Sequence, residues 1–573
     1  MMLLDWVGEH VSVPFLLSTL LIIYVFHELY WKRRKLPPGP VPWLVAGNML
    51  EVLLNPDIDK LFLKWKQKFG GIFTFWIGPI PMVMVADVPL LKKYFIKHGD
   101  MFSGRWRNFI TDHMLDGFNG VVQTDGEKWR EQRRFSLHVL RDFGVGRSFM
   151  ENKVMREIDR FLDNLDLAIE KNDGIIEPDK LLGVCVGNII NDILFSRTFE
   201  QTDKDFLEMQ HVLDQQSQLV TKPINGLYLT LPFTVKIPVL NSSWKKLTAV
   251  RDTFWHFLDA QINEHRVAFD QHLAEQNEKK SCHPVTRSNT GSAKDISTAP
   301  LRAYRISESE NSEEDFEFIQ NDENRENRQK SYATETDSAQ EIDYLDSDFT
   351  YVYMKEMHQR KLSGEMGFFS DVQLKMLLLD LFFAGSETTV TTAKWGLVLL
   401  INHPEIQKKV HEELDCVPNR VGMEHRNRLS YLQATINEIQ RLANILPINL
   451  LRTVTQDIEI DGYRFKKGSM VLPQVSILLN DPDHFPEPEE FRPDRFLDEN
   501  QNLRRFEAFM PFSIGKRQCL GESLARMELF LIFANLLRNF SFESCDGEIS
   551  NRRVLGLTVS PPKFRCKVRR REY

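Results

Sequence analysis

The sequence has few cysteines and no strong excess of charge of either sign. Six of its 573 residues are cysteine, they lie far apart, and none share the C-x-x-C spacing of a zinc site. Neither a disulfide scaffold nor a zinc cluster is indicated, and the composition favours a reducing compartment. Lysine and arginine number 72 against 80 aspartate and glutamate, a net charge of −8. A nucleic-acid-binding protein is therefore a poor hypothesis.

The length needs an explanation, because single hydrophobic cores seldom grow past ~250–300 residues. Residues 276–341 are rich in Ser, Thr, Asn, Gln and Glu, and hold nine Lys+Arg against fourteen Asp+Glu. Such a segment buries too little apolar surface to offset the entropy of ordering, so we predict a disordered low-complexity insert. It could accept phosphate on its serines, but an inert expansion of a surface loop is the preferred interpretation.

Residues 11–26 are almost entirely apolar and are followed by the basic cluster Lys32-Arg33-Arg34-Lys35. Sixteen helical residues span about 24 Å, short of a ~30 Å hydrocarbon layer, so a membrane span must include Tyr30 and Trp31 at the interface. A cleaved signal peptide or a core helix are the alternatives. The acidic residues before the run and the missing cleavage site argue against the signal peptide.

These features predict the order of segments along the chain. Residues 1–35 form a single-pass membrane anchor, and residues 36–50 form a proline-rich hinge. Residues 51–573 form one large domain with the insert 276–341 inside it. Because positive flanks stay cytosolic, everything beyond Lys32 should lie in the cytosol. Helical patterns at 127–140, 370–402 and 522–539, with strand-like runs at 72–77 and 81–85, predict a mainly α fold with a small β region.

The strongest chemical signal is Phe512-Ser-Ile-Gly515-Lys-Arg517-Gln-Cys519-Leu-Gly521, directly before an apolar helix. A cysteine at a helix N terminus beside cations has a stabilised thiolate and is a candidate soft metal ligand. Gly515 and Gly521 would let the backbone approach a large flat ligand, and Phe512 could shield the sulfur from water. A lone cysteine in such a place is more often buried and inert, so the full spacing carries the argument.

This spacing resembles the haem-binding loop F-x-x-G-x-R-x-C-x-G of the cytochrome P-450 superfamily, and other family motifs follow in family order from residue 36 onward. The resemblance is to the microsomal group that oxidises drugs, steroids and fatty-acid derivatives. It implies the cytochrome P-450 fold, preceded here by one N-terminal transmembrane helix. It also implies haem (iron protoporphyrin IX) with Cys519 as the axial thiolate, a ligand that favours O–O cleavage.

Ala384-Gly385-Ser386-Glu387-Thr388-Thr389 interrupts a long apolar helical pattern. A glycine and back-bonding threonines suit a local widening or kink that could hold water. In the family this is the oxygen-activation motif, which implies that Glu387 and Thr388 are catalytic and supply protons to dioxygen. A polar patch on a half-exposed helix is the plainer alternative.

Two further motifs imply binding and structural roles. Glu438 and Arg441 lie three residues apart on one helical face, which alone indicates a surface pair. By resemblance they join Arg495 in a buried Glu-Arg-Arg network that supports folding and haem retention. Three further residues, together with Arg517, match the family's contacts to the haem propionates: Trp129, Arg133 and Arg452.

The cationic residues Lys128, Arg130, Arg134 and Lys516 should surround the proximal surface, and we hypothesise that they steer an acidic electron donor. By resemblance this donor is NADPH–cytochrome P-450 reductase, so NADPH acts only indirectly. No G-x-G-x-x-G follows a strand here, which agrees with an outside electron source.

The resemblance also implies a substrate pocket with an apolar lining, and an apolar lining favours a hydrophobic small molecule. The side chains predicted to line it are Leu381, Phe382, Ala384, Ile445, Leu446, Ile448, Leu450 and Leu557. Each could equally be an ordinary core residue.

Together these expectations describe a haem-thiolate monooxygenase of the endoplasmic reticulum membrane. It would bind O2, a xenobiotic, steroid or fatty-acid-like substrate and membrane lipid, and no nucleic acid. Two alternatives stay open. One is a haem-thiolate isomerase or dehydratase acting on lipid peroxides, against which the Glu387/Thr388 pair argues. The other is a non-catalytic haem sensor that signals through the insert.

Overall fold

The computed structural model describes residues 13–44, 46–55, 57–143, 148–200, 203–281 and 348–572. The chain divides into two compact units, residues 1–266 with 348–573, and residues 267–347. The described part of the second unit, 267–281, is the end of helix α12 (Ser242–Ser281). Six residues of the predicted insert, 276–281, are therefore helical, which corrects the predicted start of disorder. The rest of that prediction, 282–341, lies outside the described residues.

Helices dominate the first unit. Before α12 the α-helices are α2 (Val13–Phe26), α3 (Met49–Leu54), α4 (Ile58–Phe69), α5 (Val88–Leu91), α6 (Phe109–Met114), α7 (Gly126–Asp142), α8 (Ser148–Lys171), α9 (Pro178–Phe195), α10 (Lys204–Val220) and α11 (Ile224–Thr230). After residue 348 they are α15 (Phe349–Ser363), α16 (Asp371–Asn402), α17 (Pro404–Leu414), α18 (Ser430–Ala443), α19 (Ser476–Leu479) and α20 (Glu522–Asn539). The expected mainly α class is confirmed.

Short π and 3-10 turns connect these helices: η1 (His27–Trp31), η2 (Lys92–Lys97), η3 (Gly99–Phe102), η4 (Pro232–Lys236), η7 (Met423–Arg428), η8 (Pro493–Phe496) and η9 (Gly515–Arg517). The strands are β1 (Ile72–Ile77), β2 (Ile80–Val85), β3 (Ile175–Ile176), β4 (Ile458–Ile460), β5 (Tyr463–Phe465), β6 (Met470–Pro473), β7 (Phe540–Ser544) and β8 (Cys566–Arg570). They form small sheets in the orders β1-β2-β6, β3-β8-β7 and β4-β5.

The sheet of β1, β2 and β6 forms a separate apolar cluster with α4. β1 pairs antiparallel with β2, which pairs parallel with β6. Phe62 and Trp65 of α4 pack on Phe73 and Phe75 of β1, and all four side chains are buried. β1 is buried from Ile72 to Trp76 and β2 from Met82 to Val85, so both faces of these strands are covered, which explains why the runs 72–77 and 81–85 are near-continuous apolar segments.

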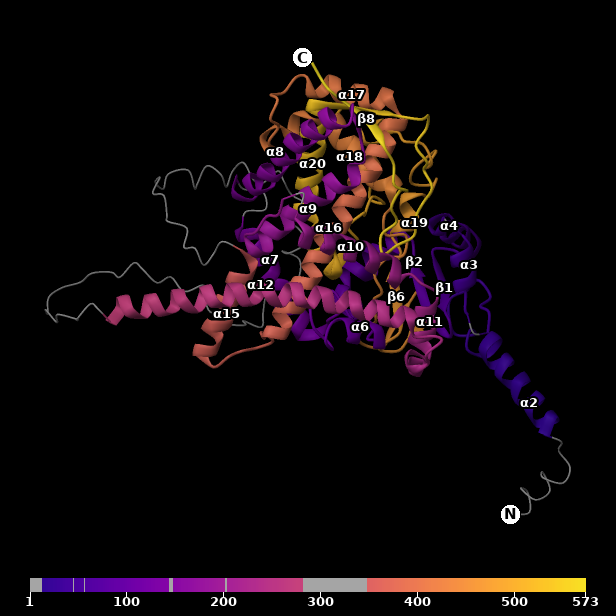
Figure 1. The fold of residues 1–573 in the computed structure, drawn as a ribbon. Helices are drawn as coiled ribbons and strands as arrows, with labels where there is room; N and C mark the ends of the chain where they lie inside the picture. Colours follow the sequence, from indigo (N-terminus) through magenta and orange to yellow (C-terminus); the bar gives the residue numbers. More distant parts are fainter. Residues whose placement is uncertain are drawn as a thin grey trace. The chain divides into compact units, whose positions relative to one another are not determined.

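Helix α16 runs among α9, α18 and α20 (Figure 1) and is buried along most of its length. Apolar residues all around a helix indicate a core position. The widening expected near Ala384 is not formed, because α16 is α-helical without interruption from Asp371 to Asn402. Gly385 instead allows close packing of two helices: a Cβ there would lie 2.4 Å from Ile190 Cδ1 of α9.

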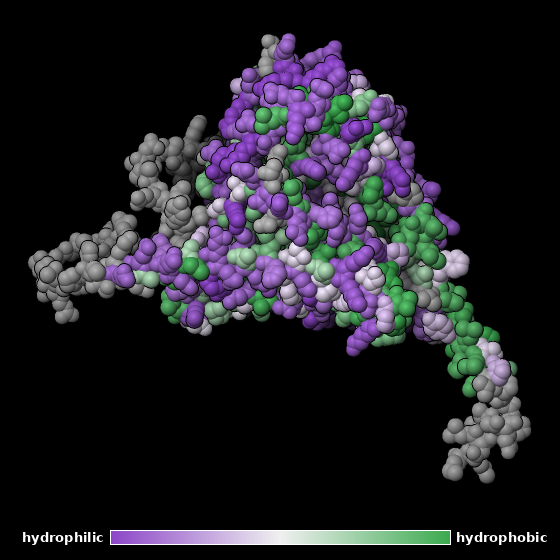
Figure 2. Space-filling view, in the orientation of Figure 1, coloured by the Kyte–Doolittle hydropathy of each residue, from purple (hydrophilic) through white to green (hydrophobic). Residues whose placement is uncertain are grey.

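The N-terminal apolar run forms α2, which continues into the π-helical turn η1. Residues Pro14–Trp31 are long and apolar enough to cross a membrane, and none is buried in the protein. Their 18 residues span about 27 Å, and Tyr30 and Trp31 lie at their end, as the sequence predicts. Apolar side chains cover α2 in the space-filling view (Figure 2).

The segment after the anchor packs on the first sheet. Lys32 Nζ binds Glu28 at 3.0 Å and the carbonyl of Pro79 at 2.8 Å. Thr74 of β1 donates its N–H to Pro38 and its hydroxyl to Pro37, each at 2.8 Å. The first prolines of the predicted hinge are thus hydrogen-bonded to the folded unit.

Candidate active site

The Cys519 loop is closed by its own backbone. The Cys519 N–H donates to the carbonyl of Phe512 at 3.0 Å, and α20 begins three residues later. Gly515 has φ +74°, and a Cβ there would lie 1.8 Å from the carbonyl oxygen of Phe95. Gly515 is therefore required by the turn and by packing on η2, and its role beside a flat ligand stays a prediction. At Gly521 a Cβ would meet no atom within 4 Å, so that position is open.

The Cys519 side chain is accessible but closely surrounded by protein. Desolvation raises the pKa of the thiol, although the Gly521 N–H and the guanidinium of Arg133 act to lower it. The stabilised free thiolate expected from the sequence is thus outweighed by burial. Coordination to a cation would remove the proton outright, because a metal ion is a larger local charge than these groups. Phe512 faces Arg526, whose guanidinium lies 4.7 Å from the ring centroid.

Four arginines gather beside this loop and bind mainly backbone carbonyls. Arg133 donates to Gln518 O at 2.7 Å, Arg452 to Ile514 O at 2.7 Å, and Arg105 to Leu451 O at 2.7 Å. Arg517 donates to Ser103 O and Thr124 O, and its guanidinium lies 3.9 Å from the centroid of the Trp129 ring. We call Arg105, Arg133, Arg452 and Arg517 the arginine cluster.

The arginine cluster has more positive charge than its surroundings balance. Desolvation and the neighbouring arginines lower the pKa of Arg517 to about 7 and that of Arg105 to about 10. The pKa of Arg452 is lowered for the same reasons, and its Nη1 is buried without a hydrogen-bond partner in the described part of the chain. Buried cations of this kind require an anionic partner.

The haem implied by the resemblance would supply that partner. Its two propionates are carboxylates, and guanidinium groups are their preferred donors. The orphaned Arg452 Nη1, the accessible Cys519 sulfur and the open space at Gly521 together fit a large, flat, dianionic ligand bound through sulfur. The donor set therefore fits haem.

Helix α16 presents one accessible strip within its buried length. Ala384 is exposed, and Leu381 and Thr388, which share its helical face, are partly exposed. The Thr388 hydroxyl donates to the Ala384 carbonyl at 2.7 Å. Glu387 is turned elsewhere: its Oε1 accepts hydrogen bonds from Ser217 and Thr558. Thr388 and Glu387, which are adjacent in the motif, therefore point in different directions.

The predicted pocket residues differ in their surroundings. Phe382 is 2% exposed and packs on Phe254 and Phe257 of α12, so it is a core residue and its predicted pocket role is wrong. Ile448 packs against the cluster around β1 and β2. Ile445 and Leu446 are half-buried, while Leu450 and Leu557 are 45% and 43% exposed.

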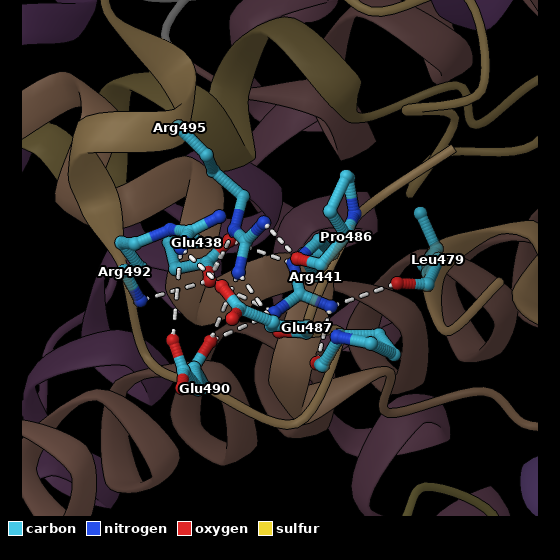
Figure 3. A network of polar contacts seen from close by, with 9 residues as sticks. Glu438, Arg441, Leu479, Pro486, Glu487, Glu490, Arg492 and Arg495 are labelled. Atoms are coloured by element: carbon cyan, nitrogen blue, oxygen red, sulfur yellow. Dashed lines mark hydrogen bonds and ion pairs between the residues drawn. The ribbon is translucent and has the colours of Figure 1, made fainter. Parts of the chain in front are cut away.

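Glu438, Arg441 and Arg495 lie together in a buried network (Figure 3). Arg441 binds the Glu438 carboxylate through two nitrogens at 2.7 and 2.8 Å, and Arg495 Nε binds it at 2.9 Å. The remaining guanidinium nitrogens donate to carbonyls at Leu479, Pro486, Glu487, Pro488 and Glu490. We call these three residues the Glu438 network. It joins α18 to η8, and both guanidinium groups contact the one carboxylate.

Sequence reasoning missed three residues that organise this region. Arg105 belongs to the arginine cluster. Asp380 of α16 accepts the N–H groups of Val121 and Val122 at 2.6 and 2.8 Å, and Gln373 bonds both the N–H and the carbonyl of Gly120. An isolated acid within the apolar run of α16 was the available signal, because such a residue seldom lies in a core without a partner.

Comparisons with known proteins agree with this geometry. The family model described as cytochrome P450 matches residues 37–296 and 316–568. The chain belongs to the cytochrome P450 family. It is 32% identical over 516 residues to cytochrome P450 2H2 of Gallus gallus, covering 89% of this chain and 88% of that protein. It is 31% identical to cytochrome P450 2J2 of Homo sapiens over 555 residues, covering 94% and 93%.

Membership establishes the general chemistry of this cytochrome P450. It is a haem-thiolate oxidoreductase, a monooxygenase acting on small molecules with O2 and a redox partner. Cytochrome P450 2C26 of Mesocricetus auratus, 31% identical over 560 residues, spans 97% of this chain and 98% of its own length. The likeness therefore includes the region of the N-terminal apolar helix, which is compatible with membrane anchoring.

Proposed function

We propose that this protein is a microsomal monooxygenase that inserts one oxygen atom of O2 into a hydrophobic xenobiotic, steroid or fatty-acid-like molecule. The electrons would come from NADPH through NADPH–cytochrome P450 reductase. The observation that carries the proposal is the arginine cluster beside the Cys519 loop, where buried cations lack the anion that a haem would bring. The net reaction is R–H + O2 + two electrons + two protons giving R–OH + water.

Cys519 is the proposed iron ligand, and the arginine cluster would hold the propionates. Trp129 would line the proposed haem site beside the arginine cluster, since it is 4% exposed and its ring packs against the guanidinium of Arg517. When bound, the haem supplies the site at which dioxygen is activated. The protein would contribute the thiolate, exclude water and orient the substrate.

Proton handling is assigned to Thr388 Oγ1. This hydroxyl lies on the accessible strip of α16 and donates to Ala384 O, so rotation about its Cβ–Oγ bond would turn its proton away from that carbonyl and toward the accessible side of the helix. Leu381 and Ala384 on the same strip would contact the substrate. Glu387 adjoins Thr388 in the chain and is the second residue proposed for proton delivery; its Oε1 is bound by Ser217, and its Oε2 has no hydrogen-bond partner among the described residues.

The proposed reductase surface includes fewer lysines than the sequence suggests. Arg130 is 45% exposed, whereas Lys128 Nζ is turned inward and binds Phe118 O at 2.8 Å and Asn119 Oδ1 at 2.6 Å. Lys128 is therefore removed from the surface set, which leaves Arg130, Arg134 and Lys516. We place the anchor in the endoplasmic reticulum membrane, with the residues beyond Lys32 in the cytosol.

A carbon-monoxide difference spectrum of the reduced holoprotein tests the ligand assignment. Wild type should show the thiolate-ligated band, and Cys519→Ser should lose it. Cys416→Ser, which changes another exposed cysteine, is the control. NADPH consumption and product formation are then measured with added reductase on a panel of lipophilic substrates.

Each outcome separates the alternatives. An unchanged spectrum in Cys519→Ser overturns the proposal. A thiolate band with no turnover of any substrate favours a haem sensor. Conversion of a lipid hydroperoxide without O2 or reductase favours an isomerase or dehydratase.

A further inference from the structure

Glu387 joins three segments that are far apart in the sequence. Its Oε1 accepts hydrogen bonds from Ser217 Oγ and Thr558 Oγ1, both at 2.7 Å, and from the Thr558 N–H at 3.4 Å. Ser217 belongs to α10, and Thr558 belongs to the C-terminal turn, which we define as residues 556–559. Because Oε2 has no hydrogen-bond partner among the described residues, the carboxylate is held in that part of the chain only through this junction.

Ser217 binds both neighbours at once. Its hydroxyl donates to Glu387 and accepts the N–H of Leu557 at 2.8 Å, while its carbonyl lies 3.1 Å from the same N–H. The side chain is buried, and a Cβ at Gly556 would lie 2.6 Å from Ser217 Oγ. The C-terminal turn can therefore approach α10 this closely only because residue 556 is glycine.

The C-terminal turn is fixed on its other side. Trp395 Nε1 of α16 donates to Val559 O at 2.8 Å, and the Val559 N–H donates to Ile445 O at 2.8 Å. Thr391 Oγ1 lies 3.2 Å from Thr558 Oγ1. Since the single Thr558 hydroxyl proton goes to the carboxylate, Thr391 must donate to Thr558. The turn is thus bound to α16, and Ser217 connects α10 to that fixed point.

We propose that Ser217 is a positioning residue that determines substrate orientation, with Glu387 as the shared acceptor. By tying α10 to the C-terminal turn, Ser217 fixes the place of Leu557, whose apolar side chain is 43% exposed and available to a hydrophobic ligand. The inference deepens the proposed function, on which its substrate readout rests. In this arrangement Glu387, the acid of the oxygen-activation motif, joins α10 to the C-terminal turn.

Hydrogen–deuterium exchange of the holoprotein tests the junction without any substrate. Ser217→Ala and Thr558→Val should each raise exchange about tenfold in peptides covering α10 and residues 553–560, because each removes a hydrogen bond to a carboxylate. Thr558→Ser keeps the hydroxyl and should restore the wild-type rate. Gln218→Ala, at an exposed position of the same helix, is the matched control and should change nothing. Unchanged exchange in both peptides overturns the proposal.

Dodecanoic acid then reports on orientation, since its chain offers several similar C–H bonds. Ser217→Ala and Thr558→Val should shift the ratio of hydroxylated isomers about threefold or more, with a larger change in KM than in kcat. Thr558→Ser should keep the wild-type ratio. If exchange rises but the ratio is constant, or if dodecanoic acid is not hydroxylated by the wild type, the orienting role is rejected. Loss of the proposed function itself would show separately, as a missing thiolate band in the wild type.

Discussion

Two buried arginine-rich regions of this cytochrome P450 differ in how their charge is balanced. In the Glu438 network, one carboxylate is bound by two arginines, and the other guanidinium nitrogens reach backbone carbonyls (Figure 3). In the arginine cluster, desolvation and then the neighbouring guanidinium groups lower the pKa values of Arg105, Arg452 and Arg517, and the carboxylates Asp125 and Asp380 offset this only in part. In the first region both guanidinium groups contact the shared carboxylate, whereas in the second we propose that the propionates of a haem supply the missing anion.

The difference teaches how to distinguish a structural ion network from a ligand site. Both regions are buried, so burial alone does not separate them. What separates them is whether each charge finds its partner within the chain. The Arg452 Nη1, which has no hydrogen-bond partner among the described residues, marks the proposed ligand site, and the bidentate pair of Glu438 and Arg441 marks the structural one.

Removing Glu438 should produce the largest effect. Glu438→Ala leaves Arg441 and Arg495 buried without their carboxylate, and we expect a loss of about 3–5 kcal/mol in the free energy of unfolding. Denaturant unfolding and the yield of folded holoprotein measure it. Arg492→Ala is the control, because it breaks only exposed pairs with Glu487 and Glu490 and should cost at most about 1 kcal/mol. Equal effects of the two variants would contradict the comparison.

Asp380 should make the free energy of unfolding depend on pH. Desolvation raises its pKa from 3.8 to about 6, despite the N–H groups of Val121 and Val122 and the charge of Arg105. The native state therefore holds this proton more tightly than the unfolded state. Its contribution to stability is present below pH 3.8 and is lost as pH rises through about 6.

Asp380→Asn keeps an oxygen acceptor for both N–H groups and removes the titration. Relative to wild type, the variant should gain about 2.4 kcal/mol of unfolding free energy between pH 4 and pH 7, since one pKa unit is worth about 1.4 kcal/mol. Denaturant unfolding at each pH measures the difference. Asp112→Asn, at an exposed carboxylate paired with Arg107, serves as the control. A difference that is constant with pH would contradict the assignment.

The sequence predicted the parts of the molecule that depend on local pattern. The apolar spacing located α7, α16 and α20 within two residues, because hydrophobic periodicity follows from helix geometry. It failed where a side chain's direction depends on distant segments. Phe382 belongs to the core because α12 packs on it, and Glu387 turns toward α10 and the C-terminal turn. No local pattern contains those contacts, and the same holds for Arg105.

A substitution in the arginine cluster should weaken binding of the proposed haem more than it lowers the stability of the fold. Arg452→Met removes the guanidinium whose Nη1 has no partner among the described residues. We expect haem to dissociate about 10- to 100-fold faster, since a hydrogen bond between charged groups contributes about 1.5–3 kcal/mol. Transfer of haem to an excess of an acceptor apoprotein measures the rate. Arg504→Met, which removes an arginine stacked on Phe506, is the control. Unfolding without faster haem loss would place Arg452 with the Glu438 network instead.

Changes at the exposed cations Arg130 and Arg134 should have the smallest effect. We expect them to alter the reductase-dependent rate, and this effect should depend on salt concentration. Arg130 forms a 3.8 Å contact with Asp100 and is 45% exposed, so its charge is screened by water and ions. Reversing charge in Arg130→Glu/Arg134→Glu should lower the reductase-dependent rate several-fold at low ionic strength, and the difference should shrink as salt is added. Lys180→Glu on α9 should leave the rate unchanged. A salt-independent loss would mean that these arginines act through the fold, because only charges that meet a partner across water lose their effect when ions screen them.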